Sequence, residues 1–234
     1  MIGLLKTLRH RFSAKRSYGQ FGEDATIQAL FKNTRKGVYL DIGAYNPVLY
    51  SNTYALYRCG WSGVVVDPNR SMETLYHWIR PRDRFENAGV GEPGEHTYFL
   101  FSDGAYNTFD HATAKRLETR SYPKLIGTRS VRTLPLGEIV QKHKLSHIDY
   151  LNIDVEGMDL EVLKTHNWNV PPTVISVENS NTGLCPFLQG HGYEMVASVG
   201  QTLVFKKSEK ISHPLPENHH HMGQECTVMD AHRG

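Results

Sequence analysis

The fold is decided by Val38-Tyr39-Leu40-Asp41-Ile42-Gly43-Ala44, an apolar run that ends in an acid and then a glycine. This pattern is typical of a buried parallel strand that stops at a sharp turn. The run Gly63-Val64-Val65-Val66-Asp67-Pro68 repeats it further along the chain. In open α/β sheets, ligands bind outside the carboxyl ends of the strands, and an acid after the second strand commonly accepts from ribose hydroxyls. The two runs therefore predict a nucleoside-binding, doubly wound domain.

The composition limits the classes of protein to which the chain can belong. The chain has 234 residues, of which 39% are hydrophobic and 21% charged, with a net charge of +2. These values predict one soluble globular domain with additions, and the small net charge argues against nucleic acid as a partner. No apolar run approaches the roughly 20 residues that a membrane span needs, so no transmembrane segment is expected.

The cysteines indicate a cellular compartment. Cys59, Cys185 and Cys226 lie far apart and lack the spacing of a zinc knuckle. This usage argues for a reducing compartment and against a disulfide framework. The opening Met1–Leu8 has too short an apolar core and too little charge before it for a signal peptide. A cytoplasmic location is therefore expected.

Strand patterns alternate with helix patterns from Asp24 onward, which predicts a parallel sheet. Gly200 separates the last two strands, which indicates a terminal hairpin. We therefore expect an α/β fold with a doubly wound, mostly parallel sheet and a C-terminal antiparallel hairpin. The predicted helices cover 24–31, 51–59, 70–79, 113–119, 159–164 and 184–189, and the predicted strands cover 38–42, 64–67, 85–90, 96–101, 150–154, 173–178, 193–198 and 202–205.

Four predicted strands end in an acid, and a doubly wound sheet would bring all four acids to one edge: Asp41, Asp67, Asp154 and Glu178. The first turn, Gly43-Ala44-Tyr45-Asn46-Pro47, keeps only one glycine, and Pro47 lacks a backbone donor. A pyrophosphate cradle needs more glycines, so NAD is not expected. S-adenosylmethionine has no phosphate and needs only a ribose grip, an adenine slot and a pocket for its amino-acid end.

An ordered set of motifs resembles the FkbM family of S-adenosylmethionine-dependent methyltransferases over roughly residues 17 to 206. The motifs are Tyr18-Gly19-Gln20-Phe21-Gly22-Glu23-Asp24, Asp41-Ile42-Gly43-Ala44, Ser51-Asn52-Thr53, Gly60-Trp61-Ser62-Gly63, Asp67-Pro68-Asn69, Asn87-Ala88-Gly89-Val90, Asn107-Thr108-Phe109 and Ile153-Asp154-Val155-Glu156-Gly157. The chain departs from the commoner pattern at Tyr45-Asn46-Pro47, where many members have a glycine. The resemblance implies a Rossmann-like class I methyltransferase fold.

The resemblance also implies the cofactor residues. Asp41 and Gly43 would line S-adenosylmethionine, and Asp67 would hold its ribose. Further cofactor-binding positions implied by the motifs are Gln20, Tyr45, Asn52, Asn87 and Ala88. Aromatic side chains are expected to wall an acceptor pocket; the candidates are Tyr45, Tyr50, Tyr54, Tyr106 and Phe109. Tyr54 and Tyr57 fit equally well in a core.

Acids after the later strands carry the candidate chemistry. Asp154 and Glu156 are expected to be catalytic, with a carboxylate that takes a proton from a hydroxyl. Asp154, Glu178 and Asn179 together resemble the magnesium site of catechol O-methyltransferase, and three oxygen ligands suit Mg²⁺. The alternative is that Asp154 and Glu156 only cap the helix near Asp159, and that Glu178 pairs with a lysine.

The expected function is O-methylation of a sugar hydroxyl in polysaccharide or glycoconjugate biosynthesis, with or without Mg²⁺. Two alternatives stay open: methylation of nitrogen or of a phosphate-linked group on a glycan, and a non-catalytic methyltransferase-like binding module. The expected partner is a glycan or small-molecule acceptor, and a homo-oligomer is an open alternative.

The ends of the chain are expected to carry no chemistry, and the methyltransferase domain is expected to cover 17–207. Residues 1–16 hold five basic side chains and no acid, with Leu4, Leu5, Leu8 and Phe12 at helical spacing. This basic amphipathic helix could contact a membrane surface or partner weakly, or pack on its own domain. Residues 208–234 are polar and rich in histidine and are predicted to be a disordered tail.

Overall fold

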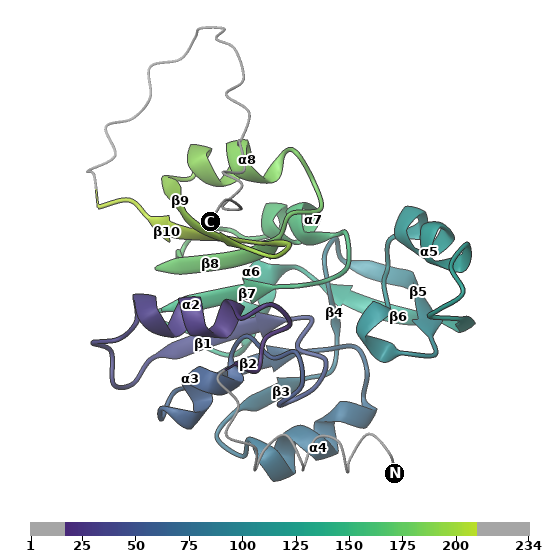
Figure 1. Cartoon of the computed structure of the whole chain (residues 1–234), viewed down its shortest axis with the longest axis horizontal. Helices are drawn as coiled ribbons and strands as arrows, with labels where there is room; N and C mark the ends of the chain where they lie inside the picture. Colours follow the sequence, from purple (N-terminus) through teal and green to yellow (C-terminus); the bar gives the residue numbers. More distant parts are fainter. Residues whose placement is uncertain (1–16, 210–234) are drawn as a thin grey trace, which may run out of the picture.

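The computed structural model describes residues 17–209, which form a central sheet with helices on both faces and a smaller sheet beside it (Figure 1). The predicted helix over 1–16 lies outside the described residues, as does the predicted tail beyond Glu209. The domain boundaries at 17 and 207 therefore stay a prediction.

The central sheet has the strand order β3-β2-β1-β7-β8-β10-β9. Its strands run parallel from β3 to β8, and β10 pairs antiparallel with both β8 and β9. This confirms the predicted mostly parallel sheet with a C-terminal antiparallel hairpin. The strands are β1 (Val38–Ile42), β2 (Ser62–Val66), β3 (Arg84–Glu86), β7 (Tyr150–Ile153), β8 (Val174–Glu178), β9 (Tyr193–Val199) and β10 (Thr202–Lys207).

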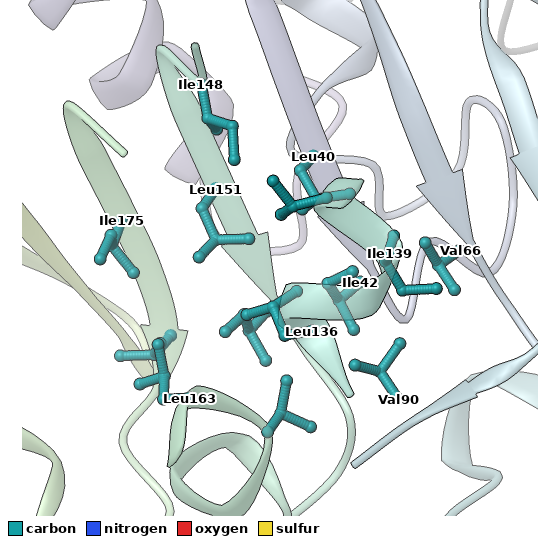
Figure 2. Packing of buried hydrophobic residues seen from close by; sticks show 14 of the residues in the cluster. Leu40, Ile42, Val66, Val90, Leu136, Ile139, Ile148, Leu151, Leu163 and Ile175 are labelled. Atoms are coloured by element: carbon teal, nitrogen blue, oxygen red, sulfur yellow. The ribbon is translucent and has the colours of Figure 1, made fainter. Parts of the chain in front are cut away.

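The strands β1, β2, β7 and β8 are buried on both faces of the sheet, which explains why they are nearly continuous apolar runs. Leu40 and Ile42 project to one face and pack with α6 (Leu136–Lys142), α7 (Asp159–Lys164) and α8 (Leu184–Gly190), as Figure 2 shows in part. Tyr39, immediately before Leu40, projects to the other face, which packs with α2 (Glu23–Leu30), α3 (Tyr54–Arg58) and α4 (Ser71–Ile79). Among residues 17–209, no helix is both long and apolar enough to cross a membrane.

A second sheet, of order β4-β6-β5, is built by residues 89–134, here called the inserted segment. It interrupts the main fold between β3 and β7. Its elements are β4 (Gly89–Val90), β5 (Gly94–Phe101), the short 3-10 helix η1 (Gly104–Tyr106), α5 (His111–Glu118) and β6 (Leu125–Leu134). In Figure 1 the inserted segment lies to one side of the central sheet, beyond the ends of β1 and β7.

The sequence analysis predicts neither β6 nor α6. The strand β6 carries Gly127 and Arg129 on its half-buried face, so the apolar alternation that signals a strand is missing. The guanidinium of Arg129 lies over the ring of Tyr98, 5.5 Å from its centroid, at a position where an apolar residue would have indicated a strand. The helix α6 is too short for its period to stand out.

The single strand predicted over 85–90 is wrong, because the chain breaks at Asn87 and Ala88. The Asn87 side-chain amide donates to the backbone oxygens of Asp67 at 3.0 Å and Pro68 at 2.8 Å. These bonds tie the break to the end of β2. As a result β3 joins the central sheet and β4 joins the small one.

The helix predicted over 51–59 is shorter than expected and begins at Tyr54. Ser51 Oγ accepts the Tyr54 backbone N–H at 3.1 Å, which ties the first residue of the helix to the preceding turn. The residues before Tyr54 are occupied by the turn that follows β1.

Candidate active site

The carboxyl ends of β1, β2, β7 and β8 meet at one edge of the central sheet, next to the inserted segment. A large cleft of about 300 Å³ opens there, at the lower end of the size range of small-molecule sites. A small cavity adjoins it. The two spaces share Gly43, Tyr45, Ala105, Asp154 and Glu156. The predicted glycine turn and the predicted catalytic acids therefore lie together, between two spaces.

The large cleft and the small cavity take their other walls from different elements. The large cleft is also lined by Gln20, Phe21, Glu23, Tyr50, Asn52, Asp103, Tyr106, Arg116, Leu117, Arg120, Asn152, Ile153, Glu178, Gln201 and Thr202. The small cavity is also lined by Ile42, Val66, Asp67, Pro68, Ala88, Gly89, Val90, Tyr98, Gly104, Asn107, Phe109 and Val155.

Gly43 has a conformation and a contact that only glycine allows. Its φ is +79°, and a β-carbon there would lie 1.8 Å from the backbone oxygen of Asp154. The ends of β1 and β7 can therefore approach each other only because residue 43 has no side chain. Its N–H donates to Val66 at 3.0 Å, which fixes the turn to the end of β2 as well.

Asp67 lines the small cavity and holds the turn after β1. Its carboxylate accepts from the backbone N–H of Tyr45 at 2.9 Å and of Asn69 at 2.7 Å, one bond to each oxygen. Burial raises its pKa to about 6, so it is largely ionised at neutral pH. A carboxylate has about four acceptor sites, so Asp67 keeps capacity for further donors.

The predicted cofactor positions Asn87 and Ala88 lie beside this cavity. Ala88 lines both the small cavity and a neighbouring pocket that Arg129 also lines. Asn87 lines only that neighbouring pocket, and its amide is engaged with the end of β2. These two positions therefore border the space that continues from Asp67.

Asp41 lies behind the wall of the cleft and does not line either space. It is 2% exposed, and its oxygens accept from Thr53 Oγ1 at 2.5 Å and from the Asn152 amide at 2.9 Å. Burial raises its pKa, and the guanidinium of Arg80 is the largest opposing influence. The structure thus gives Asp41 a supporting position, and a direct cofactor contact stays a prediction.

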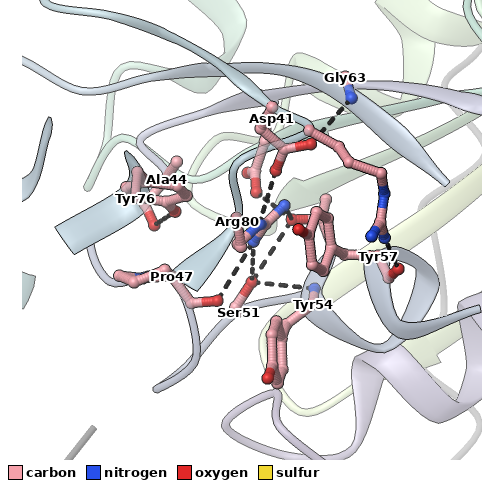
Figure 3. A network of polar contacts seen from close by, with 12 residues as sticks. Asp41, Ala44, Pro47, Ser51, Tyr54, Tyr57, Gly63, Tyr76 and Arg80 are labelled. Atoms are coloured by element: carbon pink, nitrogen blue, oxygen red, sulfur yellow. Dashed lines mark hydrogen bonds and ion pairs between the residues drawn. The ribbon is translucent and has the colours of Figure 1, made fainter. Parts of the chain in front are cut away.

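The network behind Asp41 centres on the fully buried Arg80 (Figure 3). Its guanidinium donates to Asp83 at 2.6 Å and to Thr53 at 2.9 Å, and it lies near the rings of three tyrosines. It also reaches the turn after β1, where it donates to the Pro47 oxygen at 3.3 Å and to Ser51 at 3.2 Å. Sequence reasoning missed Arg80, because an arginine before a proline at a helix end carries no signal of burial.

Asn52 presents an unmatched acceptor at the cleft. Its amide nitrogen donates to Asn152 at 3.2 Å, whereas its Oδ1 is buried and has no partner among residues 17–209. Asn152 also accepts from Ser176 at 2.6 Å, which fixes its orientation. A buried carbonyl oxygen without a donor is costly, and such exceptions are often explained by a ligand.

The Tyr18–Asp24 motif forms one wall of the cleft. Asp24 accepts from Ser17 Oγ at 2.6 Å and from the Tyr18 backbone N–H at 2.7 Å, which folds the segment tightly before α2. A β-carbon on Gly19 would lie 2.9 Å from the free oxygen of Asn52. This close approach places the motif, including Gln20, beside Asn52 at the cleft, and a contact of Gln20 with the cofactor stays a prediction.

Asp154, Glu156 and Glu178 form a group of acids around the cleft. Asp154 is exposed at the cleft, and partial desolvation by the surrounding protein together with the charge of Glu178 raises its pKa to about 7. Burial and then the two other acids raise the pKa of Glu156 to about 8. Burial raises the pKa of Glu178, and Arg116 opposes this. Carboxyls with pKa values near neutrality suit general acid–base chemistry.

The loop that carries Glu156 is strained. Glu156 has a φ of +54° and Gly157 one of +104°, two left-handed residues in succession. A β-carbon on Gly157 would lie 2.9 Å from Thr113 Oγ1, so α5 packs directly against this loop. The inserted segment therefore helps to determine where the Glu156 carboxyl lies.

The predicted magnesium ligands gain no support. Asp154 and Glu178 both line the cleft, but Asn179 is exposed and is not part of its lining. Within residues 17–209, no group of three or more histidine, cysteine, aspartate or glutamate residues is arranged to hold a metal ion.

The aromatic positions divide between the predicted pocket and the core. Tyr45, Tyr50 and Tyr106 line the large cleft, and Phe109 lines the small cavity. Tyr54 is 3% exposed and belongs to the core, as the alternative interpretation allowed.

Tyr45 and Tyr122 both donate to Asp103, at 3.5 Å and 2.9 Å.

Comparison with known proteins gives one family. A model described as "Methyltransferase FkbM domain" matches residues 41–195, which span β1 to β9. No curated protein matches the chain.

Proposed function

The chain belongs to the FkbM methyltransferase family, and we propose that it uses S-adenosylmethionine to methylate a sugar hydroxyl in polysaccharide or glycoconjugate biosynthesis. The observation that carries the proposal is the position of Asp154 and Glu156. They lie where the large cleft meets the small cavity, so they border both spaces. The predicted cofactor residues line both spaces, and an acceptor hydroxyl that enters the large cleft would meet the methyl donor at these carboxyls.

Residues on both sides of Gly43 fit the cofactor. At the small cavity, Asp67 has unused acceptor capacity for ribose hydroxyls, and at the large cleft the unmatched Oδ1 of Asn52 fits the ammonium of the amino-acid end. Gly43 leaves the floor between these positions free of a side chain. When bound, S-adenosylmethionine supplies an electrophilic methyl group on a sulfonium centre, whose positive charge suits a site rich in carboxylates.

Glu156 is the stronger candidate for the general base, and Asp154 lies beside it. A sugar hydroxyl is almost entirely neutral at pH 7, so its oxygen needs a group that accepts its proton during methyl transfer. Burial and neighbouring acids raise the pKa of Glu156 to about 8, which makes its ionised form a better proton acceptor than an ordinary carboxylate. The remaining task of the site is to hold the two reacting atoms in line.

Assistance by Mg²⁺ is the second version of this mechanism. Asp154 and Glu178 would supply oxygen ligands, and the ion would lower the pKa of the hydroxyl. The exposed position of Asn179 weakens this version. Activity that survives exhaustive EDTA treatment would support the metal-free mechanism, whereas loss of activity that added Mg²⁺ restores would overturn it.

The alternative functions differ in what they ask of these acids. Transfer to an amine would need a carboxyl only to remove a proton from the ammonium form of the acceptor, so a raised pKa would not be required. A phosphate-linked glycan would bring its own negative charge into the site. A non-catalytic binding module would need neither acid. The group of acids beside the proposed cofactor residues favours the hydroxyl acceptor.

Two measurements on the full chain test the proposal. Calorimetry with S-adenosylhomocysteine should give saturable binding, and NAD should give none. Labelled methyl transfer from S-adenosylmethionine should then be detected with hydroxyl-bearing glycans and not with matched amine acceptors. A folded protein that binds no S-adenosylhomocysteine would overturn the proposed function.

A further inference from the structure

Two arginines of the inserted segment face the large cleft. Arg116 lies in the last turn of α5, and Arg120 follows one helical turn later, just after the helix. Leu117, between them, is 1% exposed and anchors the helix in the core of the inserted segment. Because α5 also packs against Gly157, the two guanidinium groups are carried by an element that is fixed relative to the catalytic acids.

Neither arginine is neutralised by a direct partner. No guanidinium nitrogen of Arg116 or Arg120 forms an ion pair or a hydrogen bond with any of residues 17–209. Carboxylates line the same cleft, yet the arginines act on Glu156 and Glu178 only through longer-range electrostatics. Their hydrogen-bond donors are therefore available to a ligand in the cleft.

The proposed cofactor does not account for both of these groups. Its sulfonium and ammonium charges are positive and would repel a guanidinium, and its one anion, the carboxylate of the amino-acid end, would neutralise only one of the two arginines. Arginine is suited to carboxylate and phosphate, because its planar fork can form two parallel hydrogen bonds to one oxyanion. Tyr50, which is 58% exposed, and Tyr106 line the same cleft and offer aromatic surfaces to a sugar ring.

We propose that the acceptor sugar carries an oxyanion, a carboxylate or a phosphate ester, and that Arg116 and Arg120 bind it and so select the acceptor. This inference rests on the proposed function and narrows its substrate class. The arginines hold the charged end of the acceptor on the inserted-segment side of the cleft, and its hydroxyl then reaches Asp154 and Glu156 on the sheet side.

The test compares three glycosides that differ in one group: methyl glucoside, methyl glucuronide and the phosphate ester of methyl glucoside. Each is titrated into the full-length protein saturated with S-adenosylhomocysteine. We expect at least tenfold tighter binding of one or both charged glycosides, and the stronger of the two identifies the oxyanion. Binding is preferred to turnover as the readout, because removing an arginine also shifts the pKa of Glu156.

The variants are Arg116→Gln, Arg120→Gln and their combination, with Arg35→Gln as a control for an exposed arginine that does not line the cleft. The double variant should lose the preference for the charged glycosides and keep its affinity for S-adenosylhomocysteine. Equal binding of neutral and charged glycosides, binding of none, or a preference that survives in the double variant would overturn the oxyanion site. Failure of S-adenosylhomocysteine to bind the wild-type protein would instead count against the proposed function itself.

Discussion

Thr108 donates from Oγ1 to the backbone oxygen of Glu156 at 2.9 Å, so the inserted segment holds the strained loop that carries the candidate base. Thr108 is 1% exposed and is itself fixed by backbone bonds to Phe99 at 2.9 Å and 3.3 Å. The position of Glu156 therefore depends on a segment that is separate from the central sheet.

Thr108→Val should reduce turnover while leaving S-adenosylhomocysteine affinity nearly unchanged. Valine fills the same volume but cannot donate to Glu156, and a buried hydrogen bond contributes about 1 kcal/mol. Steady-state kinetics and calorimetry check this together. Thr108→Ser keeps the hydroxyl and should retain activity, so equal losses in both variants would contradict the positioning role.

Glu156→Gln should lower kcat by roughly 10²- to 10⁴-fold, the usual contribution of a positioned base. In the wild-type protein the base must be ionised, and its pKa is raised to about 8. The value of kcat/KM should therefore rise with pH through the range of about 7 to 8. In the Glu156→Gln variant this rise of kcat/KM with pH should be absent. Glu118→Gln, at an exposed glutamate outside the cleft, is the control. A pH profile unchanged by Glu156→Gln would assign the base elsewhere.

Asp154→Asn should stabilise the protein at alkaline pH. The pKa of Asp154 is raised from 3.8 to about 7 in the folded protein. Between these values the folded state holds a proton that the unfolded state has lost, so the free energy of unfolding falls as pH rises. The amide removes this dependence. Thermal unfolding should show a larger gain in Tm at pH 8 than at pH 4, and the opposite order would contradict the raised pKa.

Asp67→Ala should weaken S-adenosylhomocysteine binding by about 1.5–3 kcal/mol, the range for hydrogen bonds to a charged group. Asp67→Asn keeps one acceptor oxygen and should lose less. Calorimetry measures both, and circular dichroism controls for the turn, because Asp67 also holds the backbone of Tyr45 and Asn69. Unchanged affinity in a folded Asp67→Ala protein would remove Asp67 from the ribose site.

Arg80→Met should destabilise the protein by about 3–5 kcal/mol, because it leaves Asp83 as a buried charge without its partner. Urea unfolding should show a lower midpoint at a similar slope. Arg80→Lys should be less harmful, and Arg35→Gln should have little effect. A loss below about 1 kcal/mol in Arg80→Met would mean that the network is not needed for stability.

Much of the fold could be predicted from local pattern. The apolar runs of β1, β2, β7 and β8 and the Gly200 hairpin are visible because burial on both faces of a sheet leaves few polar residues in a strand. The Gly43 turn and the strand-end acids were predicted for the same reason. The strand β6 was not, because Arg129 and Gly127 occupy its half-buried face.

The sequence by itself determined the α/β class, the sheet edge that carries the acids and the family resemblance, since each depends on residues close together in the chain. Only the tertiary structure decided which of these residues meet a ligand space. It turned Asp41 inward to Thr53 and Asn152, paired Asn52 with Asn152, and brought Arg116 and Arg120 to the cleft. These contacts join residues far apart in sequence, and their geometry depends on how whole elements pack, which no local periodicity records.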